Sequence, residues 1–206
     1  EEQFGIEVGL GGRAKEEAVT IAEMQRGLFI ALIIIYVILA WVFSSYGWPF
    51  LVLSVIPMGL TGAIVGHMIM GLDLTIISLF GFFGLSGIVI NDAIIFITTY
   101  RRITESEEFK CSERSYNDAI VETSCCRLRA VTVTSITTIA GLSPLLFETS
   151  LQAQFLIPMA VSICFGEAFA TTLVLLVIPA LLSIYENSKH KIAIAWQRSE
   201  EEPKEI

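Results

Sequence analysis

The chain has 206 residues, a formal net charge of −8 and a mean hydropathy of +0.70. Hydrophobic residues make up 54% and charged residues 17%, against about 25% charged in soluble domains, which excludes a disordered chain, a nucleic-acid binder and most soluble enzymes. The four cysteines show neither CxxC nor Cys/His metal spacing, and no nucleophile–base arrangement is present. We therefore expect no metal, no cofactor and no enzymatic activity.

The apolar residues gather in five blocks, and each block predicts a membrane-spanning helix. A spanning helix needs about 20 mostly apolar residues, because the hydrocarbon core is about 30 Å thick and a helix rises about 1.5 Å per residue. In chain order the predicted spans are residues 28–45, 49–71, 74–100, 130–147 and 155–185. We expect an all-α membrane protein, with a five-helix bundle over residues 28–186.

The segments outside this bundle have different expected roles. Residues 1–27 are typical of the end of an extracytoplasmic domain and its lead-in to the first span, and residues 187–206 form a polar tail. Three Lys or Arg residues precede the first span, whereas ten lie in the loop after the third span and in the tail. Those ten are Arg101, Arg102, Lys110, Arg114, Arg127, Arg129, Lys189, Lys191, Arg198 and Lys204. Basic residues favour the cytoplasmic side, so we predict an external N-terminus and a cytoplasmic C-terminus.

The loop between the third and fourth spans carries a helical pattern. Over residues 112–127, Tyr116, Ala119, Ile120 and Thr123 recur at three- and four-residue spacings, with charged residues between them. This pattern predicts an amphipathic helix along the cytoplasmic face. The alternative is a solvated connector with partial helicity.

Asp92 is the first candidate functional residue, because an ionisable residue inside a span is costly and by default indicates function. It follows Asn91 in an otherwise apolar span, where its carboxyl group could take up and release protons. The alternative is a protonated Asp that only donates a hydrogen bond between helices. Thr134, in the hydroxyl-rich start of the fourth span, has a similar predicted depth, so we expect the two side chains to face each other. The alternative for Thr134 is a hydrogen bond to its own preceding turn.

Two further ionisable residues lie within spans. His67 follows Gly59, Gly62 and Gly66, which form the small-residue spacing of a close helix contact, so we interpret His67 as a structural interface residue. Glu167 follows Gly166 deep in the fifth span. It is either a second proton site or an acid that a neighbouring group keeps protonated.

Several stretches are specific enough to indicate a family. They are residues 22–27 before the first span, 87–93 in the third, 127–135 at the start of the fourth, and 141–159 from the fourth into the fifth. Over about residues 5–186 the chain resembles the resistance–nodulation–division (RND) efflux permeases of the hydrophobe/amphiphile class. The resemblance corresponds to the last five of that family's twelve spans.

The resemblance implies a proton path. In the family, an acidic pair in the fourth span acts with a Lys in the tenth and with a Thr and an Arg in or near the eleventh. Asn91 and Asp92 stand where the best-known members have Lys-Asn, while Thr134 matches the family Thr and Arg127 the family Arg. The implied path here is Asp92, Asn91, Thr134 and Arg127, and Glu167 replaces a residue that is usually uncharged.

The resemblance also implies a function and partners. It predicts the C-terminal transmembrane portion of a proton-driven multidrug or amphiphile exporter in the bacterial inner membrane. The implied partners are the lipid bilayer, the first seven spans and periplasmic porter domain of the same permease, and a homotrimer with a periplasmic adaptor and an outer-membrane channel. Two alternatives stay open: a truncated or degenerate module that does not transport, and an RND-superfamily component for lipid or protein export.

Overall fold

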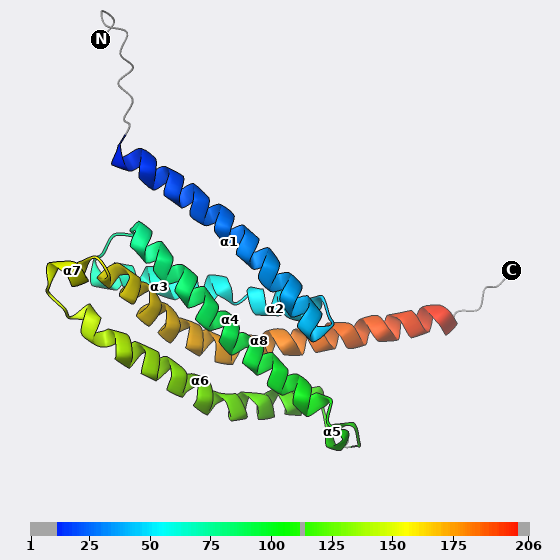
Figure 1. The fold of residues 1–206 in the computed structure, drawn as a ribbon. Coiled ribbons are helices and arrows are strands. Elements are labelled where there is room, and N and C mark those ends of the chain that lie inside the picture. The colour runs from blue at the N-terminus through cyan, green and yellow to red at the C-terminus, as the bar shows by residue number, and fades with distance from the viewer. Residues whose placement is uncertain (1–11, 112–113, 202–206) are drawn as a thin grey trace, which may run out of the picture.

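The computed structural model describes residues 12–111 and 114–201, and every regular element within them is a helix. The elements are α1 (Arg13–Phe43), α2 (Gly47–Leu53), α3 (Ile56–Met70), α4 (Ile76–Thr104), α5 (Glu107–Cys111), α6 (Tyr116–Leu146), α7 (Leu151–Gln154) and α8 (Ile157–Glu201). The long elements run alternately between the two ends of the bundle, with α2 and α3 together forming one passage (Figure 1). The predicted all-α fold is confirmed for the described residues.

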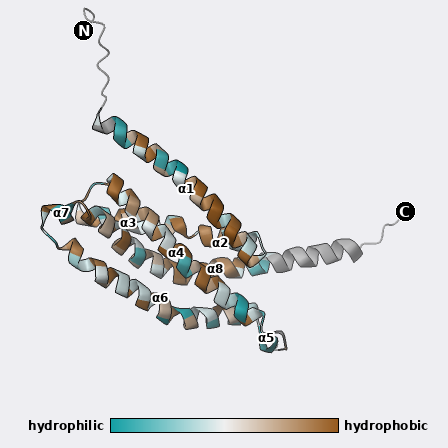
Figure 2. Cartoon of the chain, viewed as in Figure 1, coloured by the Kyte–Doolittle hydropathy of each residue, from teal (hydrophilic) through white to brown (hydrophobic). Residues whose placement is uncertain are grey.

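Four helical stretches among the described residues are long and apolar enough to cross a membrane. They are Lys15–Phe43, Gly47–Met70, Ile76–Thr104 and Ile157–Ser188. The predicted span over residues 130–147 lies in α6, which has 31 residues but carries many hydroxyl side chains that lower its hydropathy. Figure 2 shows α6 in paler colours than the strongly hydrophobic second half of α1. The expected count of five spans is therefore not confirmed, and the span in α6 stays a prediction.

The amphipathic segment predicted over residues 112–127 is not a separate helix. Residues 112–113 lie outside the described part, and from Tyr116 the helix continues unbroken as α6, because no Gly or Pro interrupts it before Gly141. Ser115 and Asp118 form a capping box that fixes its start. The apolar residues Ala119 and Ile120 are buried in the hydrophobic core. This face therefore packs against the bundle, and a separate helix along the cytoplasmic face is not confirmed.

The predicted span over residues 49–71 is interrupted between α2 and α3. Pro57 lies in the first turn of α3 and has no N–H to offer to the carbonyl of Leu53, so the helix is broken before Ile56. The passage ends at Gly71, which adopts a left-handed conformation (φ 64°) that favours glycine.

The centre of the bundle is the contact among α3, α4 and α8, where glycines let the helices approach closely. A Cβ atom added to Gly62 would lie 2.3 Å from the Cβ of Phe169 and 3.0 Å from the backbone oxygen of Phe165. A Cβ atom added to Gly81 of α4 would lie 2.6 Å from the Cβ of Ser162. The backbones therefore meet at distances that leave no space for a larger residue.

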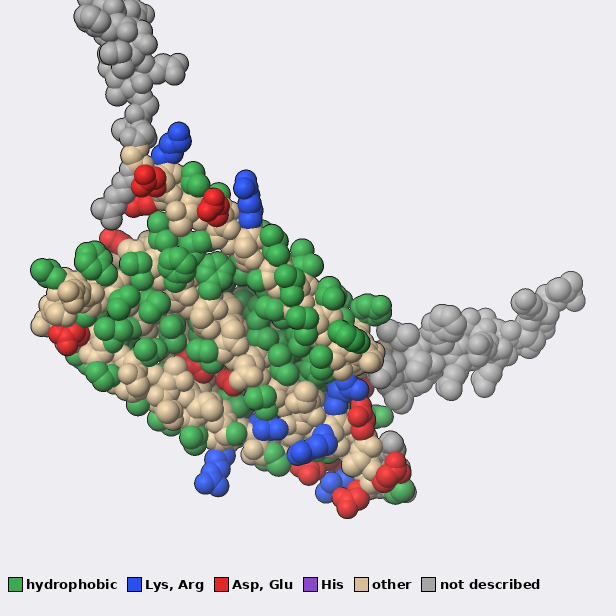
Figure 3. All heavy atoms as spheres, viewed as in Figure 1, with side chains coloured by type: hydrophobic (Ala, Val, Ile, Leu, Met, Phe, Trp, Pro, Cys, Tyr) green, Lys and Arg blue, Asp and Glu red, His purple; other side chains and the backbone are tan. Residues whose placement is uncertain are grey.

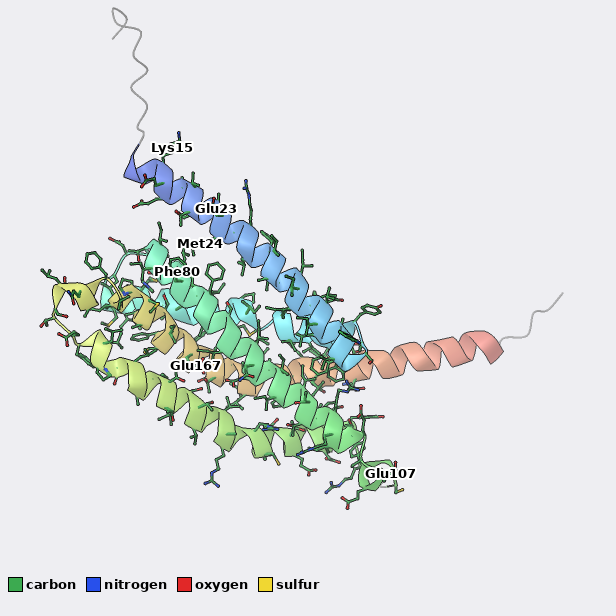
Figure 4. The ribbon with its side chains drawn as sticks, in the orientation of Figure 1. Lys15, Glu23, Met24, Phe80, Glu107 and Glu167 are labelled. Atoms are coloured by element: carbon green, nitrogen blue, oxygen red, sulfur yellow. The ribbon has the colours of Figure 1, made fainter. Side chains whose placement is uncertain are left out.

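The first helix lies apart from this centre. In Figure 1, α1 slopes away from the other helices, and an apolar cavity of about 520 Å³ lies between α1, α2, α3 and α4. Met24 of α1 and Phe80 of α4 are labelled beside this gap in Figure 4. Phe29 and Trp41 of α1 are 68% and 85% exposed. Figure 3 shows the resulting hydrophobic surface, with Lys and Arg side chains near the start of α1 and around α5. A bilayer would cover such a surface.

Candidate functional site

Asp92 lies in α4 and is 7% exposed. Among the described residues its carboxyl group has no hydrogen-bond or ion-pair partner, and Glu167 of α8 is the charged group that acts on it electrostatically. The preceding residue, Asn91, is exposed. Successive residues of a helix point about 100° apart, so the polar pair is divided between the inside and the outside of the bundle.

Thr134 does not contact Asp92 through a hydrogen bond in the described structure. Its side chain is exposed, and its hydroxyl donates to the backbone oxygen of Val131 at 2.8 Å. Thr137 and Thr138 likewise donate to the carbonyls of residues 133 and 134. The helices α4 and α6 are neighbours as expected, but the predicted Asp92–Thr134 bond is absent among the described residues because Thr134 lies on an exposed face of α6.

Glu167 belongs to a polar cluster inside the bundle. It is 1% exposed, and its Oε1 atom accepts a hydrogen bond from the hydroxyl of Ser135 at 2.9 Å. Thr171, one turn further along α8, lies 3.5 Å from the same oxygen and 2.5 Å from the Ser135 hydroxyl. Figure 4 shows Glu167 on α8 in the region where this helix faces α6. The cluster thus joins α6 to α8 within the apolar bundle.

Arg127 lies closer to the end of the bundle at which α6 starts. Its Nε atom donates to the hydroxyl of Thr99 at 2.6 Å, and Thr99 is itself buried in α4. Thr99 lies seven residues, or two helical turns, after Asp92, so both belong to the same face of α4. The structure therefore places Arg127 on this face of α4 without direct contact to Asp92.

His67 lies in the α3–α4 interface near the opposite end. The side chain is 2% exposed, with Nδ1 2.9 Å from the backbone oxygen of Ala63 and Nε2 2.8 Å from the hydroxyl of Ser78. Ser162 of α8 donates to the backbone oxygen of Ser78. Both ring nitrogens therefore have a partner: Nδ1 lies within α3, Nε2 links α3 to α4, and Ser162 links α8 to the same Ser78.

Sequence reasoning did not single out Thr99, Thr171 and Ser78 as partners of the ionisable residues. Helical spacing offered a signal for two of them, because Thr99 is seven residues after Asp92 and Thr171 is four after Glu167. Ser135 was recognised as part of a hydroxyl-rich stretch, but its pairing with Glu167 joins residues 32 apart in sequence. Such a pairing depends on which helices are neighbours.

Apolar spanning helices with isolated buried acids define a class of multi-pass membrane proteins with a polar site inside the bundle. Within that class, this chain belongs to the AcrB/AcrD/AcrF family, which matches residues 3–186. The expected resemblance to RND permeases is thereby confirmed.

Curated relatives and solved structures agree with this assignment. The chain is 27% identical over 187 residues to the swarming motility protein SwrC of Bacillus subtilis (strain 168) and 26% identical over 186 residues to the multidrug resistance protein MdtC of Proteus mirabilis (strain HI4320). Each match covers 90% of this chain and 17% of the relative.

Two crystal forms of a heavy metal efflux pump share the fold. Crystal form I is 27% identical with a TM-score of 0.73, over 85% of this chain and 17% of the pump. Crystal form II is 28% identical with a TM-score of 0.68, over 78% of this chain and 16% of the pump. The chain thus spans about a sixth of the length of the relatives that it matches.

Proposed function

We propose that this chain is the C-terminal transmembrane portion of a proton-driven RND efflux permease, in which Asp92 takes up and releases a coupling proton. The observation that carries the proposal is the burial of Asp92 in a spanning helix without a basic partner among the described residues. An ionised Asp in the middle of a span costs about 2.5 to 3.5 kcal/mol on insertion scales. Binding a proton removes this cost, so the charge of Asp92 can favour one arrangement of the helices over another.

The surrounding residues support specific roles in this proposal. Asn91 and Thr134 are exposed, and the remaining spans of the permease would cover them. Arg127 and Thr99 lie on the Asp92 face, two turns towards the end that the basic residues predict to be cytoplasmic. Protons would leave Asp92 past this pair. The residues of α6 from 130 onward would cross the membrane as a fifth span, since their hydroxyl groups donate to backbone carbonyls and need no water.

The rest of the proposed assembly rests on the resemblance to RND permeases. We propose that the first seven spans and a periplasmic porter domain complete the permease, and that a homotrimer with a periplasmic adaptor and an outer-membrane channel operates from the bacterial inner membrane. MdtC is described as a multidrug resistance protein, which supports amphiphilic compounds as substrates.

The proposal is tested by Asp92→Asn in the complete permease. Asn keeps the shape of the side chain but cannot exchange a proton at this site, so we expect the variant to insert and fold yet lose most proton-driven export. The measurement is efflux of a fluorescent amphiphile from cells whose expression levels are matched by immunoblot. Asn91→Ala is the neighbouring comparison, and its loss should be smaller because Asn91 has no titrating group.

Two outcomes would contradict the proposal. Near-normal efflux in Asp92→Asn would remove Asp92 from the proton path. An unaltered permease that exports no amphiphile under any gradient would favour the two alternatives, a module without transport activity or a component for lipid or protein export.

A further inference from the structure

A second buried acid lies outside the proton path that the family resemblance implies. Glu167 is the more deeply buried of the two acids, at 1% exposed against 7% for Asp92. Its Oε1 atom accepts a hydrogen bond from Ser135, whereas its Oε2 atom is buried and has no hydrogen-bond partner among the residues that the structure describes. A carboxyl group with one oxygen satisfied and one unsatisfied has room for one further hydrogen, which a proton on Oε2 would supply.

The groups around Glu167 favour neutralisation of its carboxyl group by a bound proton, because no basic side chain contacts it among the described residues. Asp92 of α4, another acid, interacts electrostatically with Glu167. The hydrogen-bond contacts of Glu167 are the hydroxyls of Thr171 in α8 and Ser135 in α6. Two basic side chains on the packed helices are engaged elsewhere: His67 of α3 contacts Ser78, and Arg127 of α6 donates to Thr99. Two carboxyl groups that influence each other in an apolar interior cannot both ionise easily.

The hydroxyl groups beside Glu167 have more acceptors than protons to donate. The single hydroxyl proton of Ser135 can go to Oε1 of Glu167, to Thr171, or to the backbone oxygen of Val131 at 3.0 Å. An ionised Glu167 would draw the Ser135 hydroxyl into a hydrogen bond with α8. A neutral Glu167 leaves that hydroxyl free to donate to the backbone oxygen of Val131 within α6. The charge of Glu167 therefore decides whether Ser135 ties α6 to α8.

We propose that Glu167 is a second coupling-proton site, interdependent with Asp92, and that Ser135 and Thr171 transmit its charge state to the α6–α8 contact. The pair alternates between one bound proton and none, and each exchange turns the Ser135 hydroxyl between Glu167 and the backbone oxygen of Val131. The proposal rests on the proposed function, because it takes the coupling ion to be a proton.

The first test reads the protonation of Glu167 without transport. Infrared difference spectra are recorded between acidic and alkaline buffer on the complete purified permease. We expect a carboxylic-acid carbonyl band that Glu167→Gln removes and Asp92→Asn shifts along the pH axis. Ser135→Ala should keep the band but change its frequency, because a hydrogen-bond donor to Oε1 is lost.

Glu148→Gln is the matched control, since Glu148 is exposed between α6 and α7 and bonds only to backbone amides there. A spectrum in which Glu167→Gln removes no band overturns the inference.

The second test reads the interdependence in proteoliposomes that hold the complete permease. Removing the acid at residue 167 removes a like charge near Asp92, so we expect the pH midpoint of gradient-driven transport to move about one unit to lower pH in Glu167→Gln. Glu148→Gln should leave the midpoint where it is. An unchanged midpoint in Glu167→Gln overturns the inference, even where transport is driven by protons.

The proposed function and the role of Glu167 can be contradicted by different results. Transport that follows a sodium gradient and ignores a proton gradient overturns both the proposed function and the coupling role of Glu167. Proton-driven transport that survives in Asp92→Asn but is lost in Glu167→Gln contradicts the role of Asp92, and it assigns the coupling to Glu167 alone.

Discussion

The helix α8 makes two contacts of opposite character. Against α3 it packs on glycines, where Phe165 and Phe169 fill the space beside Gly62. Against α6 it meets hydroxyl side chains, and Ser135 donates to Glu167. The first contact depends on volume and the second on hydrogen bonds. In a bilayer, apolar side chains gain nothing by leaving lipid for a neighbouring helix. Close packing and hydrogen bonds are therefore the interactions that hold the helices together.

This difference predicts how each contact responds to substitution. A glycine contact has no flexible group that can yield, so added atoms must displace a backbone. A hydroxyl contact can lose one bond and keep its shape. The three substitutions below test this, from the largest expected effect to the smallest.

Gly62→Leu should have the largest effect. Even the first added carbon would lie 2.3 Å from the Cβ of Phe169, so α3 and α8 must separate. We expect a loss of about 3 kcal/mol of stability, towards the upper end for overpacked cores, and a several-fold loss of folded protein. The measurement is recovery of monodisperse protein after detergent extraction and heating. Gly87→Ala is the control because a Cβ there meets nothing within 4 Å. Equal recovery of the two variants would mean that glycine packing does not hold this contact.

Ser135→Ala should have an intermediate effect. It removes one donor to Glu167, while Thr171 keeps its place beside the same oxygen. Hydrogen bonds between membrane helices contribute about 0.6 kcal/mol on average and up to about 1.7, so we expect a loss of about 1 kcal/mol. Thermal unfolding in detergent measures it. Ser143→Ala, which removes only a bond to the backbone oxygen of Ala140, should shift the midpoint less. A loss as large as that of Gly62→Leu would erase the distinction between the contacts.

Thr99→Val should have the smallest effect on stability. The two side chains have similar volume, and the change removes the acceptor of Arg127, a partly exposed group that water or lipid headgroups can also bind. Contacts of exposed charged side chains are worth about 0.2 to 1 kcal/mol, so we expect about 0.5 kcal/mol. A double-mutant cycle with Arg127→Ala isolates the pair. A coupling energy above that of the Ser135–Glu167 contact would reverse the order of the two polar contacts.

Much of the fold could be predicted from local sequence. The apolar blocks predicted where α1, α4 and α8 would form, because a continuous apolar helix is the structure that a bilayer admits. The boundaries were less accurate: α6 runs without a break from Tyr116, within the amphipathic helix predicted over residues 112–127, into the span predicted over 130–147, and Pro57 breaks the passage formed by α2 and α3. Both errors come from local backbone geometry that hydropathy does not register.

The candidate site was also predicted in part from the sequence. The sequence by itself determined which acids lie in apolar helices, since Asp92 and Glu167 are visible as isolated charges in apolar blocks. Tertiary structure decided their partners. Thr134 was expected beside Asp92 from its depth, but the rotation of α6 about its axis turns Ser135 inward to Glu167 and leaves Thr134 exposed. A shift of one residue rotates a side chain by about 100°, and only the packing of α6 against α4 and α8 fixes that rotation.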